Sequence, residues 1–197
     1  MKYKVFLFDT DGVVVLSEMF SNHYSQKNNI PKEEMLPFFT GVFQDCMKGK
    51  ADLKEVIKPW LVKWQWNESV DEFLKQWFEH ENNIDEKVIE FINQLKKEGI
   101  KCYLATNQEK YRTEYLKNKM KFGELFDGIF SSAYIGHKKP TKEFYEFILD
   151  NLNIPAKEIF YLDDDVKNIE IAKELGIESY LYKDFDKFIK YLKTKTD

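Results

Sequence analysis

Two carboxylates at the end of a short apolar run carry the first chemical signal in the chain. Asp9 and Asp11 directly follow the run 5–8 and precede Gly12. The run is too short for a helix and rich in aromatic and branched residues, which predicts a buried strand that ends at the acids. Residues two apart share a face in extended chain, so both carboxylates point the same way. A bound divalent cation would explain the pair, and so would two turn-forming Asp residues that close a strand.

Other predicted strands also end in polar residues. After residue 83, helical and strand patterns alternate, which predicts parallel strands joined by right-handed helical crossovers in a three-layer α/β sheet. Functional groups of such sheets lie at the carboxyl ends of the strands. The polar residues at these ends are Thr106 and Asn107, Ser131 and Ser132, and Asp163 to Asp165. We therefore expect them to lie near Asp9 and Asp11.

Lys139, in a loop ahead of a predicted helix, completes a set suited to phosphate chemistry. Carboxylates from two strands suit Mg²⁺, which leaves its other positions to water and phosphate. Thr106, Asn107 and Lys139 offer hydrogen-bond donors and positive charge for a phosphate. One carboxylate could form an acyl phosphate while a second acts as general acid and base. Each residue alone also fits a helix cap, a solvated loop lysine or a polar helix start.

Residues 16–83 are predicted to form an all-helical insertion. The segment carries all four tryptophans and many phenylalanines, which we expect to form the core of a small helical bundle. Such a cap, inserted after the first strand, could cover the site. The predicted boundaries are 1–15 and 84–197 for the α/β core and 16–83 for the cap. Phe43 and Lys48, between Gly41 and Gly49, are the candidate substrate contacts.

The chain carries four polar motifs in a fixed order: the acid pair at 9 and 11, Thr106-Asn107, Lys139, and the acids that begin at 163. These motifs resemble those of the haloacid dehalogenase superfamily, in the branch with a helical cap. The matching stretches are Phe-Asp-Thr-Asp-Gly-Val-Val at 8–14, Leu-Ala-Thr-Asn at 104–107, Lys139-Pro140, and Phe-Tyr-Leu-Asp-Asp at 160–164 with Asn168. The resemblance covers nearly the whole chain. It implies a Rossmann-like parallel sheet as the core.

The resemblance assigns different chemistry to the two acids of the first motif. Asp9 would attack phosphorus, and Asp11 would act as general acid and base and lend its backbone carbonyl to Mg²⁺. The true dehalogenases of the family lack an acid at the position of Asp11, because a halide leaving group needs no proton. Asp11 therefore favours phosphoryl transfer over carbon–halogen hydrolysis.

The resemblance also implies roles for the other strand-end residues. The residues implied to hold the phosphate are Thr106, Asn107 and Lys139. Asp164 would be a direct metal ligand beside Asp9 and Asp11, with Asp163 orienting the metal waters or Lys139. Asn168 would support this acidic loop. Because Asp165 follows, the choice of acid that binds the metal stays open.

The sequence thus predicts a Mg²⁺-dependent phosphomonoester hydrolase acting on a small phosphorylated metabolite through an aspartyl-phosphate on Asp9. A sugar phosphate is the expected substrate. A phosphomutase would use the same site but would need a cap that grips the sugar phosphate, and the cap contains no arginine. A non-catalytic cation-binding module is the third alternative, although neither acid pair continues with calcium-loop spacing.

The composition excludes several other classes of protein. With 43% hydrophobic and 16% aromatic residues, the 197-residue chain is not disordered. A net charge of -4, with Arg112 the single arginine, argues against a nucleic-acid-binding protein. No run approaches the ~18 apolar residues that span a membrane. We expect a cytoplasmic monomer or homodimer, with Arg112 exposed and the histidines (His23, His80 and His137) on the surface or in cap packing.

Overall fold

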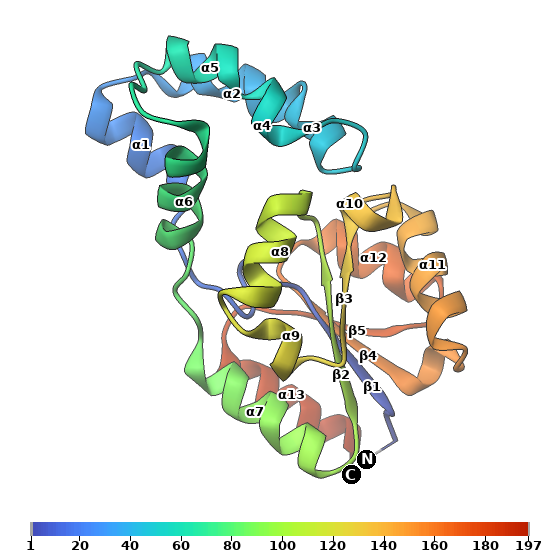
Figure 1. Cartoon of the computed structure of the whole chain (residues 1–197). Helices are drawn as coiled ribbons and strands as arrows, with labels where there is room; N and C mark the ends of the chain where they lie inside the picture. Colours follow the sequence, from blue (N-terminus) through green and yellow to red (C-terminus); the bar gives the residue numbers. More distant parts are fainter. Residues whose placement is uncertain (1, 197) are drawn as a thin grey trace.

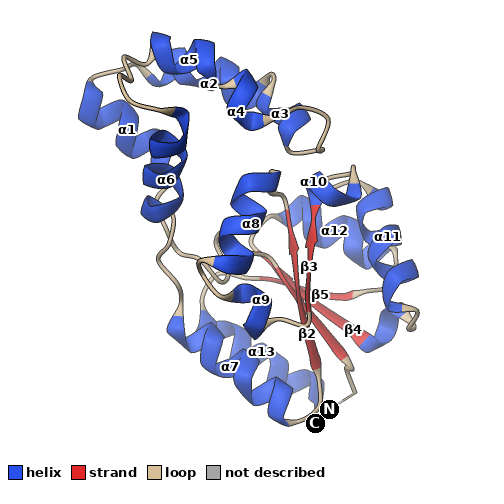
Figure 2. Cartoon of the chain, viewed as in Figure 1, coloured by secondary structure: helices blue, strands red, loops and turns tan. Residues whose placement is uncertain are grey.

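A parallel β-sheet lies at the centre of the molecule. The computed structural model describes residues 2–196. The sheet has five strands in the order β3-β2-β1-β4-β5, and each neighbouring pair is parallel. The strands are β1 (Val5–Phe8), β2 (Lys101–Thr106), β3 (Gly128–Ser131), β4 (Ile159–Asp163) and β5 (Glu178–Leu181). The first strand is therefore the central one, and the predicted α/β fold is confirmed (Figures 1 and 2).

Helices cover both faces of the sheet, because successive strand side chains point to opposite sides. Phe6 and Phe8 of β1 pack with one helical layer, whereas Val5 and Leu7 pack with the other. The first layer contains α7 (Glu86–Lys97), α8 (Lys110–Asn118), α9 (Phe122–Leu125) and α13 (Phe185–Thr196); the second contains α11 (Lys142–Leu152) and α12 (Val166–Glu174). The short helices α10 (Ser132–Ile135) and η1 (Ala156–Glu158) follow β3 and precede β4. Within residues 2–196, no helix is long and apolar enough to span a membrane.

A group of helices between β1 and α7 forms a second hydrophobic cluster above the sheet (Figure 1). The helices are α1 (Phe20–Asn28), α2 (Lys32–Thr40), α3 (Phe43–Cys46), α4 (Leu53–Val56), α5 (Lys58–Lys63) and α6 (Val70–His80). Phe38, Trp64 and Phe73 are fully buried at its centre, so the aromatic residues serve mainly as core. We call these helices the cap. The boundaries 1–15, 16–83 and 84–197 stay a prediction.

Some helices begin or break where the sequence pattern did not indicate it. The pattern predicts one helix over 52–64, but α4 and α5 are separate and meet at Ile57. Pro59 favours the break, because proline lacks an amide hydrogen and is accommodated best in the first turn of a new helix, where it lies in α5. The pattern also predicts α12 from Asn168. The helix begins earlier because the Asp165 carboxylate accepts the Lys167 N–H at 2.9 Å and so caps it.

Two adjacent segments connect the cap to the core. The Leu16 N–H donates to the Asn83 carbonyl at 2.7 Å, and the Asn83 N–H donates to Ser17 Oγ at 2.9 Å. The Asn83 side chain donates in turn to the Leu16 carbonyl at 3.2 Å. A β-bridge between Val15 and Ile84 lies next to these bonds. The chain therefore leaves and rejoins the core at a single place.

Arg112 is buried between the cap and the core, so its predicted exposure is wrong. The side chain is 3% exposed, and its guanidinium lies over the rings of Phe78 and Tyr115. It donates to the Phe78 carbonyl at 3.0 Å and to the Glu81 carbonyl. These carbonyls lie at the C-terminal end of α6, where the last turn of a helix lacks donors of its own. One side chain of α8 thus holds the end of a cap helix.

Replacing Arg112 with Met is expected to lower the free energy of unfolding by about 2–4 kcal/mol, because two charge-assisted hydrogen bonds to buried carbonyls are lost. Arg112→Lys keeps a charge but not the planar pair of donors, so its loss should be smaller. Urea unfolding of both variants measures the difference. Wild-type stability in Arg112→Met would show that the contact does not hold the cap.

Candidate active site

Asp9 lies at the end of the central strand with one free carboxylate oxygen. Its N–H donates to the Leu162 carbonyl at 2.9 Å, which ties it to β4. The side chain is 12% exposed, and its Oδ1 accepts the Thr10 N–H at 2.7 Å and lies 2.7 Å from Lys139 Nζ. Burial raises the pKa of Asp9 well above its ordinary value, although Lys139 opposes this. Within residues 2–196, no donor contacts Oδ2, which leaves that oxygen for a ligand.

The Lys139 ammonium lies between two carboxylates. It is 2.7 Å from Asp9 Oδ1 and 2.7 Å from Asp163 Oδ2, and the side chain is 1% exposed. Burial lowers the pKa of Lys139, but the two carboxylates raise it by more than burial lowers it. The net shift of the pKa is therefore upward. The ammonium therefore stays charged beside the candidate nucleophile.

Asn107 positions Lys139 with its side chain. Asn107 Oδ1 accepts the Lys139 N–H at 2.8 Å, and its Nδ2 donates to the Lys139 carbonyl at 2.9 Å. The sequence predicts that Asn107 holds phosphate, and this stays a prediction. In the structure its amide oxygen and one hydrogen of its Nδ2 bind the Lys139 backbone. The side chain thus acts on the site by fixing the loop that carries the ammonium.

Asp163 is the structural centre of the acidic loop. Its Oδ1 accepts the Asp165 N–H at 2.8 Å and Asn168 Nδ2 at 2.9 Å. Its Oδ2 accepts from Lys139 and from the Tyr161 hydroxyl. Burial alone would raise the pKa of Asp163, but Lys139 and these hydrogen bonds hold it below its ordinary value. Protein donors, Asn168 among them, thus bind both carboxylate oxygens of Asp163, and the supporting role of Asn168 stays a prediction.

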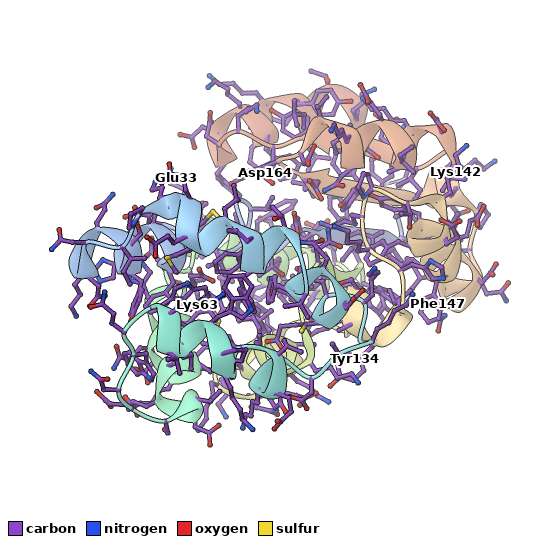
Figure 3. All side chains as sticks on the ribbon, turned by 90° about the horizontal axis from the view of Figure 1, so that it is seen from above. Glu33, Lys63, Tyr134, Lys142, Phe147 and Asp164 are labelled. Atoms are coloured by element: carbon purple, nitrogen blue, oxygen red, sulfur yellow. The ribbon has the colours of Figure 1, made fainter. Side chains whose placement is uncertain are left out.

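Asp164 and Asp9 form the part of the acidic group that remains open to a metal. Asp9, Asp163 and Asp164 offer carboxylate oxygens within 4.8 Å of one another, and protein donors occupy those of Asp163. Asp164 is exposed, and partial desolvation together with the neighbouring Asp163 raises its pKa. Seen from above, Asp164 lies between the cap and the C-terminal half of the core (Figure 3). This set of hard oxygen donors fits Mg²⁺.

Gly12 makes room for this arrangement. Its φ is 80°, a left-handed conformation that glycine adopts without steric cost. A Cβ atom at this position would overlap the Asp164 carboxylate. The glycine of the first motif therefore permits both the turn after Asp11 and the close approach of the acid from β4.

Thr106 offers a buried hydroxyl with no protein partner. The side chain is 1% exposed and lines the same cleft as Asp9. Within residues 2–196, its Oγ1 makes no hydrogen bond. A buried polar atom of this kind is costly unless a ligand or water satisfies it. A phosphoryl oxygen next to Asp9 would do so.

Asp11 faces the cleft and is held by a residue that the sequence analysis did not single out. Gln108 Nε2 donates to Asp11 Oδ2 at 2.6 Å. The Gln108 carbonyl accepts from the hydroxyls of Ser131 and Ser132 at 3.1 and 3.2 Å, so the polar end of β3 orients Gln108. Asp11 is exposed to the cleft, and partial desolvation there raises its pKa although Arg112 and Gln108 oppose this. The position of Gln108 directly after the Thr-Asn pair was the available signal.

A cleft of about 650 Å³ lies between the acidic sheet edge and the cap. Its core side contains Asp9, Asp11, Thr106, Lys139 and Asp164 among others. Its cap side contains Ser17, Met19, Ser21, Phe39, Phe43, Met47, Trp77 and Glu81. The predicted contact Phe43 is thus part of the cleft, but Lys48 is not among the lining residues. Lys48 instead pairs with Asp45, one turn earlier in the chain, at 3.1 Å.

Glu109 caps α8 beside the site and is itself buried. It is 2% exposed and accepts the N–H groups of Tyr111 at 2.7 Å and Arg112 at 2.5 Å. Burial raises the pKa of Glu109 from 4.5 to about 7. The unfolded chain therefore releases this proton at lower pH than the folded chain does. For an acid with a raised folded pKa, stability falls as pH rises between the two values.

Glu109→Gln is expected to remove this decline, which amounts to about 3 kcal/mol at most for a difference of ~2.5 pKa units. The two N–H groups bind different carboxylate oxygens, so the single glutamine oxygen keeps one of these hydrogen bonds, and the loss of the other lowers stability equally at both pH values. Urea unfolding of wild type and variant at pH 5 and pH 7.5 measures the effect, with the variant gaining stability relative to wild type at the higher pH. An identical pH dependence in both proteins would contradict the prediction.

The structure combines a central parallel sheet with a cluster of acidic and polar side chains at the carboxyl ends of its strands. Residues 6–182 match the family model of haloacid dehalogenase-like hydrolases, and the chain belongs to that family. The resemblance stated from the motifs is therefore confirmed.

Three relatives illustrate where the chain stands. A sesquiterpene phosphatase of Aspergillus oryzae is 33% identical over 93 residues, or 47% of this chain and 47% of that protein. A D-ribitol-5-phosphate phosphatase of Bacteroides thetaiotaomicron is 26% identical over 147 residues, or 72% and 71%. The magnesium complex of a haloacid dehalogenase-family enzyme from the same bacterium has a TM-score of 0.80 and 21% identity, with 96% and 99% covered. The chain thus spans about half the length of the first of these relatives, and two of the three are named as phosphatases.

Proposed function

We propose that this protein is a Mg²⁺-dependent phosphomonoesterase that works through an aspartyl-phosphate on Asp9. The observation that carries the proposal is the free Oδ2 of Asp9 next to the charged Lys139 and the unpartnered Thr106 hydroxyl. A phosphate there would meet a nucleophile, a cation and a hydrogen-bond donor at once. Asp9 and Asp164, with the backbone carbonyl of Asp11, would hold Mg²⁺, which neutralises phosphate charge when bound.

The reaction would proceed in two steps. Asp9 Oδ2 attacks phosphorus and the bond from phosphorus to the ester oxygen breaks, while protonated Asp11 gives its proton to the leaving alcohol. Asp11, now a carboxylate, takes a proton from a water that attacks the aspartyl-phosphate, which releases phosphate and restores Asp9. Lys139 and Thr106 stabilise the charge on the phosphoryl oxygens in both steps. Gln108 keeps Asp11 in position.

The two alternatives from the sequence receive less support. A mutase must hold a sugar phosphate while it turns over, yet no Lys, Arg or His from the cap lines the part of the cleft formed by residues 2–196. A cation-binding module would not require the buried Lys139 or the unpartnered Thr106 hydroxyl. The two phosphatase relatives are named for phosphates of a polyol and of a sesquiterpene, so the alcohol remains to be assigned. The sugar phosphate expected from the sequence is one choice.

Asp11→Asn tests the proposal with p-nitrophenyl phosphate. The p-nitrophenolate group leaves without a proton, so the first step should survive, but water activation should not. We expect kcat to fall by about 10²–10⁴-fold and the acid-quenched variant to carry phosphate on the peptide that contains Asp9. Chelation of Mg²⁺ should abolish both phosphate release and labelling. Turnover without Mg²⁺, or turnover with label on another residue, would contradict the proposed mechanism.

A further inference from the structure

The cap side of the cleft is a continuous aromatic wall. The rings of Phe39 and Phe43 are 5.5 Å apart, and they lie 5.8 and 5.7 Å from the ring of Trp77. Met47 and Met19 extend the apolar lining. Trp77 also contacts Phe73 within the cap core, so packing behind the wall holds it in place. The wall is therefore built before a substrate arrives.

The cap side of the cleft, as formed by residues 2–196, has no positively charged side chain that could bind a second anionic group. Glu81 is the charged cap residue among those that line the cleft in residues 2–196, and its carboxylate already accepts the Phe20 N–H at 2.8 Å. Lys48 and Lys138 are not among the lining residues and have other partners: Lys48 pairs with Asp45, and Lys138 donates to the Gln44 side chain. A carboxylate or second phosphate on the leaving group would meet apolar rings and a negative charge.

The far side of the cap also rests on the core, so the wall lies over the site. A Cβ atom at Gly49 would overlap the Ala133 carbonyl, which shows how closely the loop after α3 approaches α10. The Tyr111 hydroxyl donates to Asp52 Oδ2 at 2.8 Å next to this contact. Together with the connection at Leu16 and Asn83, these contacts hold the cap at both sides of the cleft. A leaving group on phosphate bound at Asp9 would thus lie below the wall.

We propose that the substrate is the monophosphate ester of an uncharged, predominantly apolar alcohol. The inference rests on the proposed phosphomonoesterase function and replaces the sugar phosphate expected from the sequence. Carbon buried against Phe39, Phe43 and Trp77 gains from leaving water, whereas a sugar would bury hydroxyls that find few partners there. The hydroxyls of Ser17 and Ser21 are the neutral polar side chains that the cap contributes within the described residues.

A series of n-alkyl phosphates from ethyl to hexyl isolates this effect, because all members share a primary-alcohol leaving group. With the full-length protein and Mg²⁺, kcat/KM should rise by about threefold for each added methylene. Pentyl phosphate and ribitol 5-phosphate form a matched pair with the same carbon number and leaving oxygen. Pentyl phosphate should be at least tenfold better. Equal or better turnover of ribitol 5-phosphate, or a flat alkyl series, would overturn the proposed substrate class while the phosphatase function stands.

Met47→Gln and Leu36→Gln provide the matched variants. Glutamine is close to both side chains in size; Met47 lines the cleft, whereas Leu36 is exposed on α2 and does not. Met47→Gln should reduce the rise in kcat/KM with alkyl chain length. Leu36→Gln should leave that rise unchanged. Equal slopes in both variants would contradict the assignment of the wall.

Binding separates failure of this inference from failure of the proposed function. If no ester is hydrolysed, the phosphatase proposal fails, and calorimetry with methyl- and hexylphosphonate still tests the cleft. Tighter binding of hexylphosphonate by at least tenfold would support the apolar subsite. Equal affinities would overturn it.

Discussion

Asp9→Asn is expected to abolish phosphate release from every phosphomonoester, with a loss of kcat of about 10⁴-fold or more. The amide keeps the shape of the side chain but lacks a nucleophilic oxygen, and no other carboxylate in the described site has a free oxygen next to Lys139. Asp163 cannot substitute, because its oxygens are held by Lys139, Tyr161, Asn168 and the Asp165 N–H. Phosphate release at saturating Mg²⁺ measures the effect.

Asp150→Asn is the control for the removal of one carboxylate, since Asp150 is exposed on α11. It should retain wild-type activity. Circular dichroism of Asp9→Asn should match wild type, which separates lost chemistry from lost folding. Residual turnover above about one-hundredth of wild type, where nucleophile loss costs far more, would mean that another group or a water attacks phosphorus directly.

Lys139→Met is expected to impair both activity and folding. Without its ammonium, the buried carboxylates of Asp9 and Asp163 lose their shared partner. Breaking a buried ion pair by removing one partner typically costs about 3–5 kcal/mol. The folded pKa values of both acids then rise, so the loss should be largest at neutral pH and shrink as pH falls through those raised values. Urea unfolding at pH 5 and pH 7.5 tests both the size and the sign.

Lys138→Met is the matched control, because it removes the neighbouring lysine and its contact with Gln44 only. Its stability should stay within about 0.5 kcal/mol of wild type, as for most surface substitutions. A double variant, Lys139→Met with Asp163→Asn, should recover part of the lost stability by removing one unpaired charge. If Lys139→Met unfolds like wild type at every pH, the ammonium does not compensate the two acids.

The strand ends could be placed from sequence because of a geometric rule of parallel sheets. Phe8 of β1 pairs with Leu104 of β2 and with Leu162 of β4, so the residues that follow each strand emerge side by side. Asp9, Thr106 and Asp163 therefore meet although more than fifty residues separate consecutive members. The short apolar runs, helix caps and glycines carried enough information for this order. The rule gives proximity, but it does not give the orientation of a side chain.

Orientation accounts for what the sequence did not reveal. Asn107 follows a strand in the expected place, yet its amide turns toward the Lys139 backbone. Arg112 looked exposed because its helix position resembles a surface position, and the carbonyls of α6 that cover it come from more than thirty residues earlier. In the cap, apolar periodicity identified the aromatic residues as packing residues. It did not tell which of them, such as Phe39 and Trp77, face the acids.

The connection at Leu16 and Asn83 has a consequence for how this protein diversifies. Because the cap departs and returns through neighbouring residues, its sequence can change or be exchanged with little demand on the sheet. The residues proposed to break the phosphate ester belong to the core, and the wall proposed to select the alcohol belongs to the cap. Selectivity and reactivity are thus encoded in separable stretches of chain. A graft of another cap between these two residues should redirect the protein to a new alcohol while the chemistry at Asp9 is inherited intact.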